Sequence, residues 1–469
     1  MERQDGFPSY AVPTTPPGLE AIYKACRRIY PDQPNPLQVT ALVKYWLGGP
    51  DPLDYISMYG HPGVPENNIP PHWHYVSFGL SDLHGDGRVH QCSGPEGPSG
   101  FGFELTFRLK REDGVNAPPT WPATLMQALA RYVFESKNTL CAGDHVPWHT
   151  SLDNSESRIQ HMLMCEDIQL PTISSSQGSV SFVQIVGVCA EEVKAAQHWT
   201  GSGVIELLRS NPLAGGEWLI TDMRRGESLL ELDPQVQETI DAGIDREGSN
   251  LSGVSGRCSW EEYKNFSEEN KENRRTERSS SRGRRISDFE SEQIKATLKR
   301  GLMGSQKSLL PPIKTEPKDQ ENDAQENMCQ NNWNRDSLDC SMRSDTPSEL
   351  LRTKYLEGCH LKVNLEAGSF ILLALKGRLK HGRHFTFLSP LNDTAITFVS
   401  TSVVGAFATE EHPYAAHGAW LQVLFTEDFV DELVDDLSDL SDLEVIINAR
   451  VYQWPERGLK ITILPDEIS

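Results

Sequence analysis

The chain lacks the features that mark several large classes of protein. Its nine cysteines include no Cys-x-x-Cys pair, so the common zinc and thioredoxin patterns are excluded and reduced thiols are expected. No apolar run approaches the roughly 20 residues of a membrane span. The first residues also lack the apolar core of a secretory signal. We therefore expect a protein of the cytoplasm or nucleus.

Positive charge is scarce as well. Lys and Arg number 44 against 66 Asp and Glu, which gives a formal net charge of −22. A surface this negative repels the phosphates of nucleic acids and the headgroups of anionic lipids. Neither direct nucleic-acid binding nor membrane docking is therefore expected.

The usual motifs of catalysis are missing. The sequence holds no P-loop, no His-Glu-x-x-His, no Gly-x-Ser-x-Gly and no set of kinase signatures. His72 and His74 alternate on a predicted strand, but a structural zinc site would need two further ligands. We favour packing or hydrogen-bonding roles for these histidines, and expect no metal, no cofactor and no catalytic residue.

One polar cluster, in residues 141–161, keeps an enzymatic alternative open. A hydrolase could use the cluster formed by Cys141, His145, His149 and Asp153. However, catalytic Cys and His are normally distant in sequence and meet only in the fold. A polar recognition surface and a hydrogen-bonded loop are the other interpretations of this segment.

Two zones, one toward each end of the chain, have apolar residues at the spacing of helices and strands. In residues 18–255, strict alternation over 100–109 predicts a half-buried strand, and the spacing over 123–136 predicts an amphipathic helix. Residues 179–189 are apolar on both faces, which is typical of a central strand. Residues 37–47 are predicted to form a further helix.

The second zone covers residues 350–469. Its apolar runs predict strands that include 369–375, 395–401, 419–425 and 459–463, with one amphipathic helix over about 427–440. The two zones together predict an α+β protein with two globular domains, each with a mixed sheet.

Between them, residues 256–349 are polar and charged and contain few aromatic side chains. Such a segment buries too little apolar surface to offset its ordering entropy, so we predict a largely disordered regulatory linker. Residues 1–17 are predicted to be a flexible N-terminal segment.

Three short patterns in the linker resemble modification sites. Arg-Arg-Ile-Ser fits a basophilic kinase and points to Ser287, and Ile-Lys-Thr-Glu fits SUMO attachment at Lys314. Thr346 precedes a proline, as proline-directed kinases require. Each pattern is common by chance, but an accessible segment would favour its use, so we predict a phosphoprotein.

Several stretches of both zones resemble the Suppressor of fused family, and the likeness is closer to insect members than to vertebrate ones. They are residues 16–59, 72–90, 99–112, 211–227, 381–387 and 395–430. The resemblance implies a non-enzymatic negative regulator of Hedgehog signalling in the cytoplasm and nucleus, with a corepressor role. It implies binding of a Gli-type zinc-finger transcription factor (Cubitus interruptus in flies), and points to the Fused kinase as a further partner.

In that family a short peptide containing Ser-Tyr-Gly-His lies as a strand between the two domains. By position, the residues that line its cleft match Tyr132 and Asp144 in the first domain, and Glu366 and Phe370 in the second. Phe370 departs from the family in side-chain type. Strand addition supplies main-chain hydrogen bonds, and the two acids could hold a charged histidine of the peptide. Neither acid is expected in a core.

Overall fold

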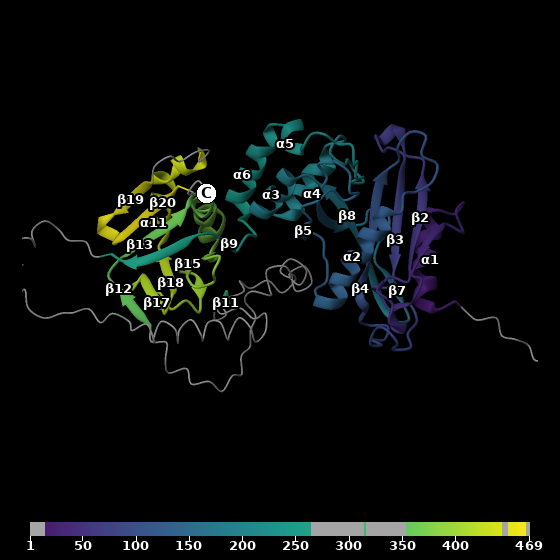
Figure 1. The fold of residues 1–469 in the computed structure, drawn as a ribbon, viewed down its shortest axis with the longest axis horizontal. Coiled ribbons are helices and arrows are strands. Elements are labelled where there is room, and N and C mark those ends of the chain that lie inside the picture. The colour runs from purple at the N-terminus through teal and green to yellow at the C-terminus, as the bar shows by residue number, and fades with distance from the viewer. Residues whose placement is uncertain (1–14, 264–313, 316–352, 443–448, 466–469) are drawn as a thin grey trace, which may run out of the picture. The chain divides into compact units, whose positions relative to one another are not determined.

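The structure is a computed structural model, and it describes residues 15–263, 314–315, 353–442 and 449–465. Their contacts divide the chain into two compact units. The first takes the described residues up to Glu238, apart from Gln197–Trp199, and the second takes the rest. Figure 1 shows sheets and helices in both, which confirms the predicted α+β class.

The first unit is built on an eight-stranded mixed sheet with the order β1-β2-β3-β4-β8-β6-β5, with β7 paired to β8. The β4 and β8 strands run parallel and the other pairs are antiparallel. The strands are β1 (Leu37–Thr40), β2 (Tyr55–His61), β3 (His72–Phe78), β4 (Pro98–Lys110), β5 (His145–Pro147), β6 (His161–Glu166), β7 (Ile173–Ser175) and β8 (Gly178–Val188).

Helices cover both faces of this sheet. Val76 and Phe78 of β3 pack with Ile22 of α1 (Pro17–Ile29), whereas the alternate residue Tyr75 bonds to Pro119, just before α2 (Trp121–Ser136). Every residue of β3 is therefore buried. The remaining helices are α3 (Ala190–His198), α4 (Gly201–Ser210), α5 (Leu229–Leu232) and α6 (Gln235–Glu247), the last of which crosses the boundary between the units.

The second unit contains a six-stranded sheet with the order β12-β17-β18-β15-β14-β9 and a four-stranded sheet with the order β10-β13-β20-β19. A two-residue strand, β11 (Lys314–Thr315), pairs with β16 (Val403–Val404). The other strands are β9 (Gly253–Ser255), β10 (Cys258–Glu262), β12 (Lys354–Leu356), β13 (Cys359–Asn364), β14 (Phe385–Leu388), β15 (Ala395–Ser400), β17 (Tyr414–His417), β18 (Trp420–Phe425), β19 (Arg450–Trp454) and β20 (Leu459–Leu464).

Residues 365–381 of this unit form a run of short helical pieces. They are α9 (Leu365–Ser369), α10 (Ile371–Leu373), a π-helical turn (Ala374–Arg378) and a 3-10 turn (Leu379–His381). With α11 (Glu427–Asp436), they share one apolar cluster with both sheets, in which Leu375, Phe398 and Phe429 are buried.

The predicted domain boundary at 255 differs from the division of the structure. Strand β9 ends at Ser255 but pairs with β14, and β10, inside the predicted linker of 256–349, pairs with β13. Both strands belong to the second unit. Composition changes near residue 255, but strands as short as β9 and β10 leave no mark on composition.

Two predicted elements are wrong, and several are confirmed. Residues 37–47 form β1 and a 3-10 turn (Tyr45–Leu47) instead of a helix, and 369–375 is helical instead of extended. A run of six apolar residues fits a buried helix as well as a strand, because periodicity cannot separate them at that length. The strand over 100–109, the helix over 123–136 and the strand over 179–189 are confirmed as β4, α2 and β8.

Candidate functional site

Tyr132 lies near the end of α2, and its surroundings are ordered by local hydrogen bonds. The helix ends at Ser136, and Lys137 follows with a left-handed backbone, φ 64°. The Asn138 side chain then donates to the Tyr132 hydroxyl over 3.1 Å. The half-buried Tyr132 ring is therefore held in place by the loop that leads to the next predicted site residue.

Asp144 lies in that loop, and it is buried, with only 6% of its surface exposed. One carboxylate oxygen accepts a hydrogen bond from the Cys141 backbone N–H over 2.8 Å, and the Asp144 N–H donates to the Cys141 carbonyl. The Met164 N–H donates to the Asp144 carbonyl and so ties the turn to β6. The expectation that neither acid lies in a core is therefore wrong for Asp144.

Asp144 leads directly into β5, which is the last strand of its sheet in the described part of the chain. The Asp144 carbonyl faces β6, so by strand alternation the backbone of His145 faces away from β6. Pro147, with no N–H to donate, suits such an edge. An edge strand is a template for pairing with another strand.

Glu366 and Phe370 lie on and just after α9 in the second unit. The Asn364 side chain caps this helix by accepting a hydrogen bond from the Ala367 N–H over 3.2 Å. Glu366 is in the first turn and is exposed, as predicted for a surface acid. The Phe370 ring is half-buried and meets the His198 ring edge to face, with 5.3 Å between ring centroids.

The helix α9 packs against the end of another edge strand, β9. A Cβ placed on Gly256 would lie 2.8 Å from the Ala367 Cβ, so glycine is needed for this approach. The Thr386 N–H donates to the Ser252 carbonyl, and the Gly256 N–H donates to the Leu388 carbonyl. By alternation, the Gly253 and Ser255 backbone groups face away from β14.

These two edge strands were missed by reasoning from the sequence. Each spans three residues, which is too short for alternation to show. The available signals were the glycines around Val254–Ser255 and the Pro-Trp sequence after Val146. Both are equally typical of loops. The structure thus places Asp144 directly before one edge strand, β5, and packs the helix that holds Glu366 on the end of another, β9.

The enzymatic alternative finds little support in the geometry of its four residues. The Asp153 carboxylate accepts hydrogen bonds from the Ser151 and Ser155 hydroxyl groups, each over 2.6 Å, instead of orienting an imidazole. Cys141 is buried, and burial lowers the pKa of His145. The exposed ring of His149 packs edge to face on His161.

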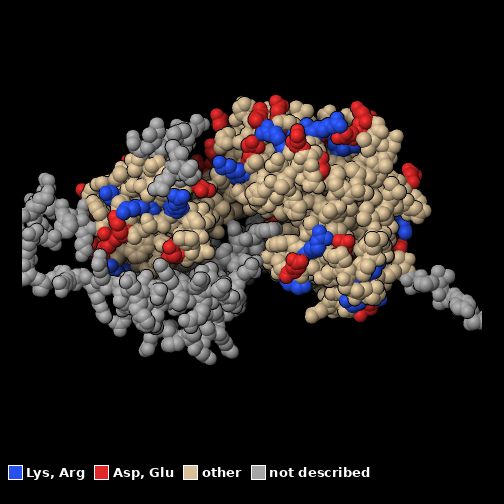
Figure 2. Space-filling model, viewed as in Figure 1, with Lys and Arg blue, Asp and Glu red and all other residues tan. Residues whose placement is uncertain are grey.

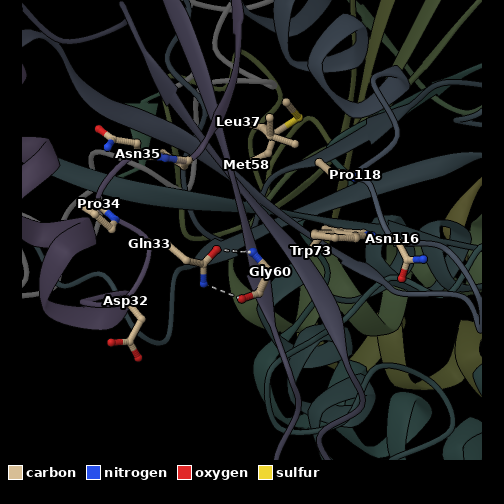
Figure 3. Close-up of a pocket in the computed structure, with 11 residues that line it drawn as sticks. Asp32, Gln33, Pro34, Asn35, Leu37, Met58, Gly60, Trp73, Asn116 and Pro118 are labelled. Carbon is tan, nitrogen blue, oxygen red and sulfur yellow. Dashed lines mark hydrogen bonds between the residues drawn. The ribbon is translucent and has the colours of Figure 1, made fainter.

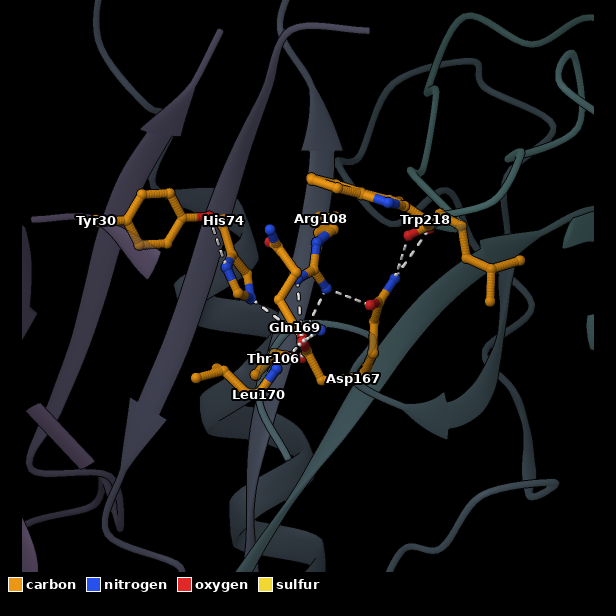
Figure 4. A network of polar contacts seen from close by, with 10 residues as sticks. Tyr30, His74, Thr106, Arg108, Asp167, Gln169, Leu170 and Trp218 are labelled. Atoms are coloured by element: carbon orange, nitrogen blue, oxygen red, sulfur yellow. Dashed lines mark hydrogen bonds and ion pairs between the residues drawn. The ribbon is translucent and has the colours of Figure 1, made fainter. Parts of the chain in front are cut away.

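A buried polar network occupies the centre of the first unit (Figure 4). His74 bonds to the Tyr30 hydroxyl over 2.9 Å and to Asp167 over 3.2 Å, in agreement with the hydrogen-bonding role predicted for it. Arg108 reaches both Asp167 oxygens, over 2.6 and 3.0 Å, and also bonds to Gln184. His74, Arg108 and Asp167 are inaccessible to solvent, so we interpret the network as structural.

A surface hollow of about 360 Å³ lies elsewhere on the first unit (Figure 3). The Gln33 side chain closes one side by bonding to both the N–H and the carbonyl of Gly60. Apolar groups that include Leu37, Met58 and Trp73 form part of its lining. None of the four predicted peptide-binding residues lines it.

The described residues contain no group of three or more His, Cys, Asp or Glu side chains placed to hold a metal ion. Among them, no helix is long and apolar enough to cross a membrane. On the face drawn in Figure 2, basic and acidic side chains are interspersed over the described residues. This distribution gives no continuous basic surface on that face.

Comparisons with known proteins identify relatives along most of the chain. A family model described as "Suppressor of Fused Gli/Ci N terminal binding domain" matches residues 238–463, and one described as "Suppressor of fused protein (SUFU)" matches residues 49–226. The Suppressor of fused homologs of Homo sapiens and Mus musculus are each 59% identical, over 96% of this chain and 92% of theirs. A crystal structure of Drosophila Suppressor of Fused aligns with TM-score 0.72 and 36% identity, over 98% of this chain and 99% of that one.

Proposed function

The chain belongs to the Suppressor of fused family, and from this membership we propose that it is a negative regulator of Hedgehog signalling that binds a Gli/Ci transcription factor. The second unit corresponds to the match whose description names Gli/Ci binding. We propose that the chain acts without catalysis, in the cytoplasm and nucleus, and that the Fused kinase is a second partner. The insect-type assignment stays a prediction.

The observation that carries a binding mechanism is the position of two of the predicted residues, Asp144 and Glu366, on segments that adjoin sheet edges. Asp144 leads into β5, and α9, which holds Glu366, packs on the end of β9. We propose that a Ser-Tyr-Gly-His peptide of the partner adds as a strand at these edges. The main chain then contributes affinity and side-chain pockets contribute specificity. That one peptide contacts both units rests on the family resemblance.

The four side chains take different roles in this proposal. Tyr132 and Phe370 offer half-buried rings, and Glu366 offers an exposed carboxylate to the peptide histidine. Asp144 holds the turn before β5, so we propose that it acts largely by positioning that strand. A direct contact of Asp144 with the peptide, as an acidic clamp with Glu366, stays a prediction.

The modification sites also stay predictions. Lys314 lies in β11, with its backbone paired to Val404, whereas Ser287 and Thr346 lie outside the described residues. We propose that these three sites regulate binding and do not form the binding surface.

Calorimetric titration of the full chain with a Ser-Tyr-Gly-His peptide tests the proposal. Glu366→Gln should weaken binding about tenfold, because a charge-assisted hydrogen bond is lost. Glu357→Gln, an exposed acid of the same unit, is the matched control and should bind like the wild type. Equal affinities for all three proteins would remove Glu366 from the site, and the absence of any binding would contradict the proposed function.

A further inference from the structure

Three arginines are buried among the described residues, and they differ in their partners. Arg108 contacts Asp167 over 2.6 Å, and Arg225 donates to Glu192 over 2.7 Å. Arg378 is only 8% exposed, yet no described carboxylate oxygen lies within 4.0 Å of it. A buried charge is normally paired, because leaving water is costly for an ion. Arg378 therefore departs from the pattern set by the other two.

The hydrogen bonds of Arg378 go to neutral carbonyl groups. Its Nε donates to the His384 carbonyl over 3.0 Å, and its Nη1 donates to the Ser249 carbonyl over 2.8 Å. These bonds satisfy donors but do not neutralise the charge. The guanidinium keeps its positive charge within the fold of a chain whose net charge is −22.

A second guanidinium approaches the same acceptor. Arg383 donates from Nη1 to the Ser249 carbonyl over 3.3 Å, and it too has no described carboxylate within 4.0 Å. Burial, and then the charge of Arg383, lower the pKa of Arg378. Two like charges that share one carbonyl repel each other, and an anion between them would remove that repulsion.

The surrounding backbone holds this pair in a fixed geometry. The Arg383 N–H donates to the Arg378 carbonyl over 2.9 Å, and the Ser249 N–H donates to the Gly377 carbonyl over 2.7 Å. A Cβ on Gly248 would lie 3.0 Å from the His381 ring, so this turn packs closely on the loop. The His381 Nε2 atom is buried and has no hydrogen-bond partner. The loop thus adds an imidazole nitrogen without a hydrogen-bond partner to two guanidinium groups without a described carboxylate partner.

We propose that Arg378, His381 and Arg383 form a binding site for an oxyanion of the phosphate class. Guanidinium groups match such oxyanions because their N–H donors are planar and permanently charged. Arg383, which is half-buried, would make the contact from the solvent side, with Arg378 behind it. The site is independent of the proposed peptide binding, since none of its residues is among the four predicted for the peptide.

Calorimetric titration of the full chain tests the site, with inorganic phosphate and N-acetylphosphoserine as probes at pH 7.5 and constant ionic strength. The wild type should bind with saturation. Arg383→Gln should bind about tenfold more weakly or worse, because charge-assisted hydrogen bonds are lost. Arg450→Gln removes an exposed arginine of the same unit that pairs with Asp439, and should bind within about twofold of the wild type, since that exposed pair contributes little.

Circular dichroism checks the fold of each variant. If the glutamine variant does not fold, Arg383→Lys takes its place. That variant keeps the charge but not the planar donors, so it should bind with intermediate affinity. Tighter binding of N-acetylphosphoserine would indicate a phosphorylated side chain as the natural ligand, and tighter binding of phosphate a free anion; both support the site. No saturable binding by the wild type, or equal binding by wild type and both Arg383 variants, would overturn it.

Discussion

The two units use their charged groups in opposite ways. In the first unit the buried acids are engaged internally: Asp167 with Arg108, Glu192 with Arg225, and Asp144 with its own turn. In the second unit Arg378 has no described carboxylate partner and Glu366 is exposed. At the predicted peptide residues, the first unit thus offers a partner a half-buried ring and edge backbone, whereas the second also offers an exposed carboxylate. Residue type alone does not reveal this difference, because it lies in the partners of each group.

The largest effect should come from breaking the internal pairing of the first unit. Asp167→Ala leaves Arg108 buried without its carboxylate, which should lower the free energy of unfolding by about 3–5 kcal/mol. Asp222→Ala, which removes the partly exposed partner of Lys110, should cost at most about 1 kcal/mol. Urea unfolding measures both. Similar small losses in the two variants would show that the first unit does not depend on this pairing.

A fall in pH should next lower the stability of the first unit more than that of the second. Burial lowers the pKa of His72 to about 3 and that of His74 to about 4 in the first unit, and that of His384 to about 4 in the second. Each is neutral when folded and takes up a proton more readily when unfolded. The contribution of each histidine to the free energy of unfolding is therefore fully present above about pH 6.5. It is lost as the pH falls toward 4, by up to about 3 kcal/mol per histidine.

Burial raises the pKa of Asp167, but Arg108 and His74 outweigh this effect and hold it well below its usual range. Asp167 therefore stays charged in the folded protein at the pH values at which these histidines lower the stability. Hydrogen exchange between pH 7 and 4.5 should show β3 and β4 losing protection before β14 and β15, because the first unit holds two of these histidines. Simultaneous loss in both units would contradict this difference.

Removing the two predicted acids, Asp144 and Glu366, should change the free energy of unfolding by amounts that differ less. Asp144→Ala removes the buried acceptor of the Cys141 N–H and should lower the free energy of unfolding by about 1–3 kcal/mol. Glu366→Ala lies on the surface and should change it by less than about 0.5 kcal/mol. Thermal unfolding of both variants measures the contrast. If Asp144→Ala were as stable as Glu366→Ala, the positioning role of Asp144 would be wrong.

Much of the fold could be predicted from the sequence because its long elements carry clear periodicity. The alternation in β4 and the spacing in α2 extend over many residues. The run around Phe370 was wrongly predicted as a strand, because burial of Ile371, Leu372 and Leu375 suits a helix or a strand. The cap at Asn364 was the missed signal for a helix.

The site could be predicted only in part. Resemblance supplied the four predicted peptide-binding residues, and the structure adds that Asp144 directly precedes β5 and that the helix holding Glu366 packs on the end of β9. Burial of Asp144 could not be foreseen, because its carboxylate is satisfied by a backbone N–H three residues earlier within a loop that looks solvated in sequence. Pairing of β9 with β14 joins residues far apart in the chain, so no local pattern encodes it.

Strand addition at β9 is the central claim, and one titration tests it most directly. Ser255 is exposed and its backbone faces away from β14, so Ser255→Pro removes one outward N–H and leaves the β14 ladder intact. Ser255→Ala removes the side chain but keeps that N–H. With the Ser-Tyr-Gly-His peptide, the account predicts that Ser255→Pro binds about tenfold more weakly, from the lost bond and the poorer fit, while Ser255→Ala binds like the wild type. Wild-type affinity in the proline variant would contradict strand addition at this edge.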